Sequence, residues 1–102
     1  MTIGSILTIA ASGMRARETA LSALAANVAN GSSEDWKPLE TRFDALEGGG
    51  VEATVTQAPD AVPDLASDMV GLVEQRLAWS ANAAVFETGA SLWDLLAMTW
   101  HD

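Results

Sequence analysis

Apolar side chains in residues 3–28 recur at alternating steps of four and three along the chain. Arg17 is the only charged residue in the row that these positions form. Steps of three and four place side chains on one face of an α-helix, and the many alanines of the segment also favour a helix. The row comprises Ile3, Leu7, Ala10, Met14, Leu21, Leu24 and Val28. We therefore predict a helix over residues 1–30 that packs against a partner along one seam.

The sequence also marks the ends of this helix. Thr2 or Ser5 can cap its start, because a hydroxyl oxygen accepts a hydrogen bond from a free amide of the first turn. Asn30-Gly31 is expected to end it, since both residues tolerate the left-handed backbone conformation that follows many helices. Gly13 lies inside the helix, where it costs on the order of 1 kcal/mol relative to alanine, and it indicates a site of close packing.

Residues 31–63 lose the helical spacing and contain prolines, polar residues and the run Gly48-Gly49-Gly50, which predicts a flexible break. Residues 51–56 alternate apolar and polar side chains, as in a short strand with one buried face. Residues 36–39 are the only plausible partner for this strand within the chain, and residues 42–46 are expected to form a short helix or turn. A small hairpin-like element, an ordered loop and a disordered connector all agree with this pattern.

Helical spacing returns at Asp64 and predicts a second helix over residues 64–102. Pro63 fits immediately before a first helical turn, and Asp64 or Ser67 can cap it. One row of this helix comprises Leu65, Met69, Leu72, Arg76, Trp79, Ala83, Phe86, Ala90, Trp93, Ala97 and Trp100. A neighbouring row comprises Ala66, Val70, Val73, Leu77, Ala81, Ala84, Thr88 and Leu95. Together the two rows form an apolar face that is wider than one partner helix covers.

Two long helices joined by a short connector form an antiparallel pair rather than a globule. We predict a single, mainly all-α domain over residues 1–102, a coiled-coil-like hairpin with a short irregular or small β connector. Trp79 and Phe86 suit either the seam of this pair or a contact with another chain. Trp93 and Trp100 lie beyond the reach of the first helix or near its start, so we expect them to meet a second molecule.

Composition and side-chain chemistry exclude several classes of function. The net charge of −9, with only five Lys and Arg residues, argues against nucleic-acid binding. There is no cysteine, no apolar run long enough for a bilayer and no pattern of a cleaved signal peptide. His101, the only histidine, has no nucleophile or metal-ligand partner, and the acidic residues of the connector lack calcium-loop spacing. We expect no enzyme activity, cofactor, metal or small-molecule substrate, and no insertion into a membrane.

Each end of the chain contains a set of short motifs. The N-terminal motifs are Ala11-Ser12-Gly13-Met14-Arg15-Ala16, Asn27-Val28-Ala29-Asn30 and Asp35-Trp36-Lys37. The C-terminal motifs are Asp68-Met69-Val70-Gly71-Leu72-Val73-Glu74, Ala78-Trp79-Ser80-Ala81-Asn82 and Leu92-Trp93-Asp94-Leu95-Leu96. In this order the N-terminal and C-terminal motifs resemble the terminal signatures of bacterial flagellar axial proteins, the family of rod and hook subunits. Residues 50–59 are similar to the short strand that leads into the middle region of proximal rod subunits.

The resemblance implies a short, proximal-rod-like subunit of the flagellar basal body. Such a chain is exported through the flagellar type III apparatus without signal cleavage, and its terminal helices pack into the axial tube of the rod that spans the periplasm. Its implied partners are further copies, other axial subunits and the export apparatus. The residues expected to pack in this assembly are Leu7, Ser12, Gly13, Met14, Leu21, Asn27, Asn30, Met69, Leu72, Trp79, Asn82, Phe86, Trp93 and Trp100.

The sequence departs from the family pattern in its middle region, which is short even for a proximal rod protein. Asp35-Trp36-Lys37 stands where Gly-Tyr-Lys is expected, and Trp79 replaces a tyrosine. A minimal rod subunit, a divergent paralogue outside the rod and a regulator that keeps only the helical parts all fit this departure. The rival function is a helical-hairpin adaptor or oligomerisation protein unrelated to the flagellum.

Overall fold

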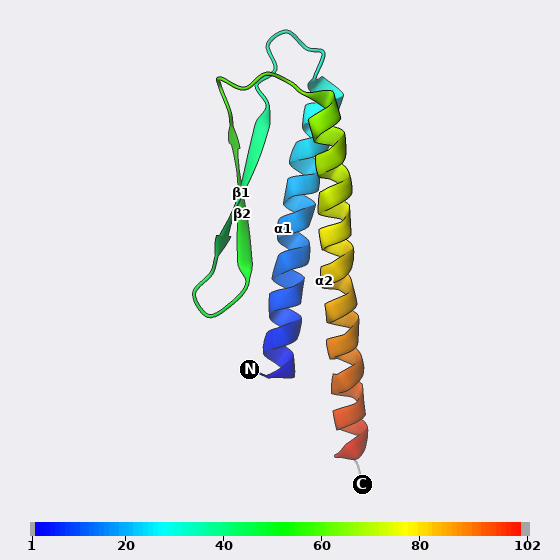
Figure 1. The fold of residues 1–102 in the computed structure, drawn as a ribbon. Coiled ribbons are helices and arrows are strands. Elements are labelled where there is room, and N and C mark those ends of the chain that lie inside the picture. The colour runs from blue at the N-terminus through cyan, green and yellow to red at the C-terminus, as the bar shows by residue number, and fades with distance from the viewer. Residues whose placement is uncertain (1, 101–102) are drawn as a thin grey trace.

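The computed structural model describes residues 2–100 and contains three elongated layers (Figure 1). Helix α1 (Ile3–Asn30) is the middle layer. Helix α2 (Leu65–Thr99) runs antiparallel to α1 on one side, and strands β1 (Leu39–Ala45) and β2 (Val51–Gln57) form a hairpin on another. The predicted mainly helical fold and the pairing of its two helices are thus confirmed, and the connector adds a two-stranded antiparallel sheet.

Both helices begin at a capping side chain. The Thr2 hydroxyl accepts a hydrogen bond of 3.0 Å from the amide of Ser5, and the Asp64 carboxylate accepts one of 3.1 Å from the amide of Ser67. These bonds satisfy an amide that the helix itself leaves unpaired. Thr2 and Asp64 are therefore the caps, and Ser5 and Ser67 are the residues that donate to them.

The end of α1 differs from the prediction of a left-handed turn. Gly31 has φ −62° and ψ −23°, which is right-handed helical backbone. At the end of the helix, the Asn30 side-chain amide donates to the Ala26 carbonyl at 2.9 Å and the Asn30 carbonyl accepts from the Ser33 amide at 2.9 Å. A Cβ at position 31 would lie 3.0 Å from the Asn27 carbonyl oxygen, a tight contact that glycine avoids.

The prediction for residues 42–46 as a helix or turn is wrong, because residues 39–45 form strand β1. This strand, rather than residues 36–39, is the partner of β2, in a register that runs from Leu39 opposite Gln57 to Ala45 opposite Val51. The inner positions of β1, Leu39, Thr41 and Phe43, are half-buried, and the residues between them are charged and exposed. A strand on a helix surface needs this alternation.

The glycine run forms the hairpin turn rather than a flexible break. Gly48, Gly49 and Gly50 have φ angles of +89°, +105° and +97°, in a region that only glycine occupies without strain. The Leu46 amide donates to the Gly50 carbonyl at 3.0 Å and closes the loop. The three glycines therefore set the reversal that pairs β1 with β2.

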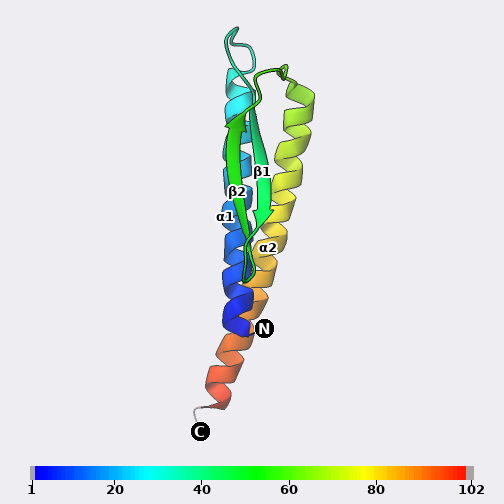
Figure 2. The same cartoon turned by 90° about the vertical axis from the view of Figure 1, so that its left-hand side faces the viewer.

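The interior of the molecule is built from small side chains. Among residues 2–100 the buried apolar residues are all alanines of α1, and no large side chain is fully buried. They are Ala10, Ala16, Ala20 and Ala23. The molecule measures 66 × 25 × 13 Å, and the C-terminal part of α2 extends past the start of α1 (Figures 1 and 2). A rod of this shape has no interior wide enough for a core of large residues.

Candidate assembly surface

Glycines let the two helices approach closely at three levels. A Cβ built on Gly13 would lie 2.6 Å from the Asn82 Oδ1 atom, and one built on Gly89 would lie 2.9 Å from Leu7. A Cβ on Gly71 would lie 3.2 Å from Leu24. The structure therefore brings together Gly13 and Asn82, two residues of the predicted assembly set. In the free chain they form a contact between α1 and α2.

Asn27 ties the hairpin to the end of α1. Its side chain is 4% exposed and makes three hydrogen bonds. The Oδ1 atom accepts from the Leu39 amide at 2.8 Å and from the Trp36 indole at 3.1 Å, while Nδ2 donates to the Leu39 carbonyl at 2.9 Å. A buried amide with both ends satisfied fixes one geometry. Asn27 thus sets where β1 begins.

Ser12 is the corresponding tie at the other end of the hairpin. Its hydroxyl donates to the Ile9 carbonyl at 2.8 Å and accepts from the Val51 amide at 3.1 Å. The neighbouring Gly50 has no room for a Cβ, which would lie 2.8 Å from the Ser12 Oγ. Ser12 and Asn27 therefore hold the hairpin against α1 in this chain.

Arg17 links all three layers, a role that sequence reasoning missed. It donates from Nη1 to the Gln75 Oε1 of α2 at 2.9 Å. Its guanidinium carbon lies 4.3 Å from the ring centroid of Phe43 on β1, within cation–π range. The signal was present, because a single cation that interrupts an apolar row needs partners once the row is packed.

The other residues of the predicted assembly set divide between the inside and the outside of the helix pair. Trp79 is half-buried, and its indole donates to the Glu18 carboxylate at 3.2 Å. The half-buried members are Leu7, Met14, Leu21, Asn30, Leu72, Trp79 and Asn82. The exposed members are Met69, Phe86, Trp93 and Trp100. The exposed group lies entirely on α2 and its C-cap, Trp100, in agreement with apolar rows that are wider than one partner helix covers.

Large apolar side chains remain uncovered on α2 in two stretches. The first comprises Leu65, Met69, Val70, Val73 and Leu77. The second comprises Val85, Phe86, Leu92, Trp93, Leu95, Leu96, Met98 and Trp100. The chain exposes 7172 Å², whereas a compact protein of this mass exposes about 5,500 Å². The difference is comparable with the area that each partner loses in one or two specific interfaces.

The charges around these stretches are mainly acidic. Asp64, Asp68 and Glu74 lie within or beside the first stretch, together with Arg76. Burial, and secondarily the nearby Asp64 carboxylate, raise the pKa of Asp68 above its ordinary value. In the second stretch, Glu87 and Asp94 are the charged residues between positions 85 and 100. The second stretch therefore carries fewer like charges than the first.

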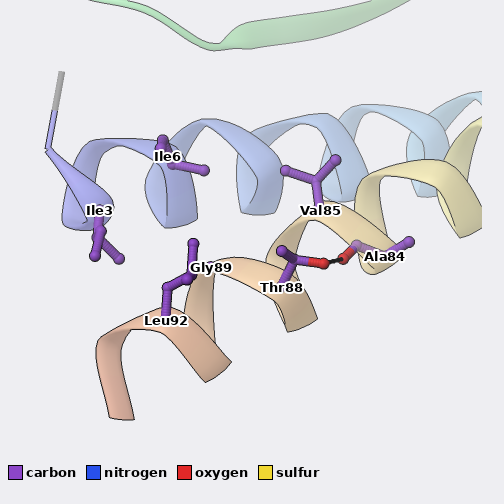
Figure 3. A pocket seen from close by; sticks show the side chains of 7 residues that line it. All are labelled: Ile3, Ile6, Ala84, Val85, Thr88, Gly89 and Leu92. Atoms are coloured by element: carbon purple, nitrogen blue, oxygen red, sulfur yellow. Dashed lines mark hydrogen bonds between the residues drawn. The ribbon is translucent and has the colours of Figure 1, made fainter. Parts of the chain in front are cut away.

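An apolar groove of about 310 Å³ lies where α1 begins (Figure 3). It is lined by Ile3 and Ile6 of α1 and, from α2, by Ala84, Val85, Thr88, Gly89 and Leu92. Within residues 2–100 no three side chains of His, Cys, Asp or Glu gather as metal ligands. Over the same residues, neither helix offers an apolar stretch sufficient to span a bilayer. His101 lies outside the described residues.

Comparisons of the sequence with models of known protein families find no match, and a search of curated proteins finds no similar protein. The class of molecule is therefore defined by the fold and surface alone. It is an antiparallel helix pair with a β-hairpin on one side and an uncovered apolar surface on its longer helix.

Proposed function

We propose that this chain is a structural subunit of the bacterial flagellar basal-body rod, which assembles by packing its terminal helices into an axial tube. The observation that carries the proposal is the apolar surface of α2. Thirteen large hydrophobic residues of that helix and its C-cap are exposed, from Leu65 to Trp100, while no large side chain is fully buried anywhere in residues 2–100. Apolar surface of this extent is typical of a chain that buries it against partners.

The packing of the pair supports side-by-side assembly. Small residues occupy the buried side of α1, and the glycines at positions 13, 71 and 89 keep α1 and α2 close together. We propose that the pair packs as a coiled-coil-like hairpin and that α2 presents its remaining apolar rows to neighbouring subunits. Among the predicted packing residues, Met69, Phe86, Trp93 and Trp100 are then the outward contacts.

The short motifs at the two ends of the chain carry the flagellar part of the proposal. They imply further copies and other axial subunits as partners, together with the type III export apparatus. Export without signal cleavage would place the chain in the periplasm-spanning rod. The proposed role is structural and includes no catalytic step, cofactor or small-molecule substrate.

Co-purification with basal bodies tests this proposal. An epitope-tagged full chain is produced at its native level in the bacterium that encodes it, and basal bodies are extracted with detergent and then washed at high salt. We expect the tagged chain to remain with the rod and the Leu77→Ser variant to be lost from it, because Leu77 is 66% exposed on α2. A chain found only outside the basal-body fraction would refute a rod function.

A second candidate is a helical-hairpin adaptor whose partner is another protein outside the flagellum. The position of the β-hairpin favours it, since the hairpin covers one side of α1 that a tube of neighbouring helices would otherwise use. Recovery of the chain in a stable complex with a non-flagellar protein, and normal motility after deletion of its gene, would favour the adaptor.

A further inference from the structure

The face of α2 that packs against α1 continues past the N-terminal end of α1. Gly89 is buried against Leu7 and Ile6, close to the start of α1. Residues 91–100, which we call the overhang, are all exposed, and the C-terminal part of α2 extends past the start of α1 (Figures 1 and 2). At about 3.6 residues per turn, four apolar residues of this part of α2 lie on the same face as Gly89. They are Leu92, Trp93, Leu96 and Trp100.

We propose that the overhangs of two copies of this chain pack antiparallel across a twofold axis at Leu96. Each overhang then lies where α1 of the other copy would continue if it were longer. Trp93 is three residues before Leu96 and Trp100 is four residues after it, so that Trp93 of one copy faces Trp100 of the other. The contact is isologous, because the same face serves both copies.

The charge distribution favours a second copy as the occupant of this face. The chain carries a net charge of −9, so self-association requires a surface with few charges. Asp94 is the only charged residue of the overhang, and it lies two residues before Leu96, on the opposite side of the helix. Pairing of the first apolar stretch with itself would instead bring together Asp64, Asp68 and Glu74 from both copies, with only Arg76 to offset them.

The helix ends are complementary in this arrangement. The C-terminus of α2 from one copy points at the N-terminus of α1 from the other, which joins the negative end of one helix dipole to the positive end of another. α1 has no acidic residue in its first turn, and α2 has no basic residue in its last turn. Within residues 2–100, the turns at these two helix ends therefore carry no compensating charge of their own, and each end can be compensated by the other copy.

The groove at the start of α1 provides a place for the end of the partner overhang. It lies between Ile3, Ile6 and Leu92 (Figure 3). Trp100, which is 86% exposed, is at the end of the overhang, where the antiparallel arrangement brings it to the groove of the other copy. An indole in this groove contacts apolar side chains of both helices and closes the seam.

The size of the contact predicts a weak dimer. A buried tryptophan removes roughly 150–250 Å² from water, so that two from each copy, with Leu92 and Leu96, give a total on the order of 1,000 Å². That area is near the lower limit for a specific interface. In the proposed tube all subunits have the same polarity, so the tube cannot contain this antiparallel contact. The dimer is therefore a form of the free chain, and it dissociates before assembly.

Single cysteines test the geometry directly, because the natural chain contains none. At a helix separation of about 8–10 Å, two Cα atoms at position 96 lie roughly 4–6 Å apart, which a disulfide spans. Leu96→Cys is expected to form a covalent dimer on mild oxidation at low micromolar concentration. Asp94→Cys, on the opposite face, is the matched control and is expected to remain monomeric. Equal cross-linking of the two variants would overturn the proposal.

Sedimentation of the full natural chain across a range of concentrations gives the second arm. We expect a reversible monomer–dimer equilibrium whose dissociation constant increases at least tenfold in Trp100→Ala. Leu77→Ala truncates an apolar side chain outside the overhang that is 66% exposed, and it is expected to leave the dissociation constant unchanged. Helix content measured by circular dichroism controls for folding. A chain that stays monomeric, or a loss of dimer equal in both variants, contradicts the twofold contact, and neither result affects the basal-body test.

Discussion

Individual polar residues on α1 decide how the layers of this molecule fit together. Asn27 and Ser12 hold the two ends of the hairpin, and Arg17 joins the hairpin to α2 through Phe43 and Gln75. Each makes hydrogen bonds that are specific in distance and direction, whereas the alanines around them contribute little contact area. The arrangement of the layers therefore depends more on these few residues than on the apolar interior.

The first prediction concerns Asn27. Asn27→Ala leaves the Leu39 amide and the Trp36 indole without their acceptor, and we expect a loss of about 2–3 kcal/mol in the free energy of unfolding. Urea unfolding followed by helix content measures it. Asn30→Ala is the matched control, because Asn30 makes one side-chain bond, to Ala26, and its loss should cost about 1 kcal/mol or less. Equal losses in the two variants would contradict the role of Asn27.

The second prediction concerns the close approach of Gly13 to Asn82. Gly13→Ala places a Cβ within 2.6 Å of Asn82, so that overpacking should cost about 1–3 kcal/mol despite the better helix propensity of alanine. Asn82→Ala removes the clashing atoms, and the double variant should regain most of that loss. A double-mutant cycle in urea measures the coupling. Strictly additive effects would mean that the helices are not in contact at this level.

At the scale of elements, the hairpin turn depends on glycine for two separate reasons. Gly48 and Gly49 both have positive φ angles, but only Gly49 is close to α1, where a Cβ would lie 2.9 Å from the Ile9 side chain. Gly48 has no atom of another residue within 4 Å of a Cβ. The two positions thus separate backbone strain from the contact between hairpin and helix.

The third prediction uses this pair. Gly48→Ala should lose about 1 kcal/mol from backbone strain alone, and Gly49→Ala should lose more, because the hairpin must also move away from α1. Proteolysis within the hairpin, together with urea unfolding, measures both effects. If Gly49→Ala is no more susceptible to proteolysis than Gly48→Ala, the turn does not rest on α1.

The two helices are predictable from the sequence because their periodic apolar positions extend over many turns. The hairpin is harder to predict, because Glu40, Arg42 and Asp44 lie on its exposed face and make residues 39–45 look too polar for a strand. The half-buried Leu39, Thr41 and Phe43 alternate with them, and that alternation is the signal for β1. The contacts of Arg17 with Gln75 and Phe43 depend on how three layers meet, which no local pattern contains.

At the scale of the whole molecule, the uncovered apolar surface of α2 is the main feature. Its exposed area contributes little to the stability of the free chain, because area that stays in water gains nothing on folding. It becomes important when partners cover it. Substitutions on this surface should therefore separate folding from assembly.

The fourth prediction makes this separation explicit. Leu77→Ser should change the unfolding free energy of the free chain by less than about 0.5 kcal/mol, because Leu77 is 66% exposed. The same variant should fail to restore motility to a strain that lacks the natural chain. Glu74→Gln, a polar change beside it, should restore motility. A Leu77→Ser variant that unfolds, or that assembles normally, would contradict an assembly role for this surface.

Amide hydrogen exchange of the full chain tests most directly whether assembly completes the packing of the two helices. It is measured at a concentration low enough to keep the chain monomeric and is then repeated in the native assembly. We expect rapid exchange over the overhang and weak protection of α1 in the monomer, because the buried apolar side chains of α1 are alanines, which contribute little packing area. Protection of both segments should rise strongly in the assembly. A sharply melting monomer that already protects both helices over their full length would show that the free chain is completely folded, and it would contradict an assembly role for the exposed surface of α2.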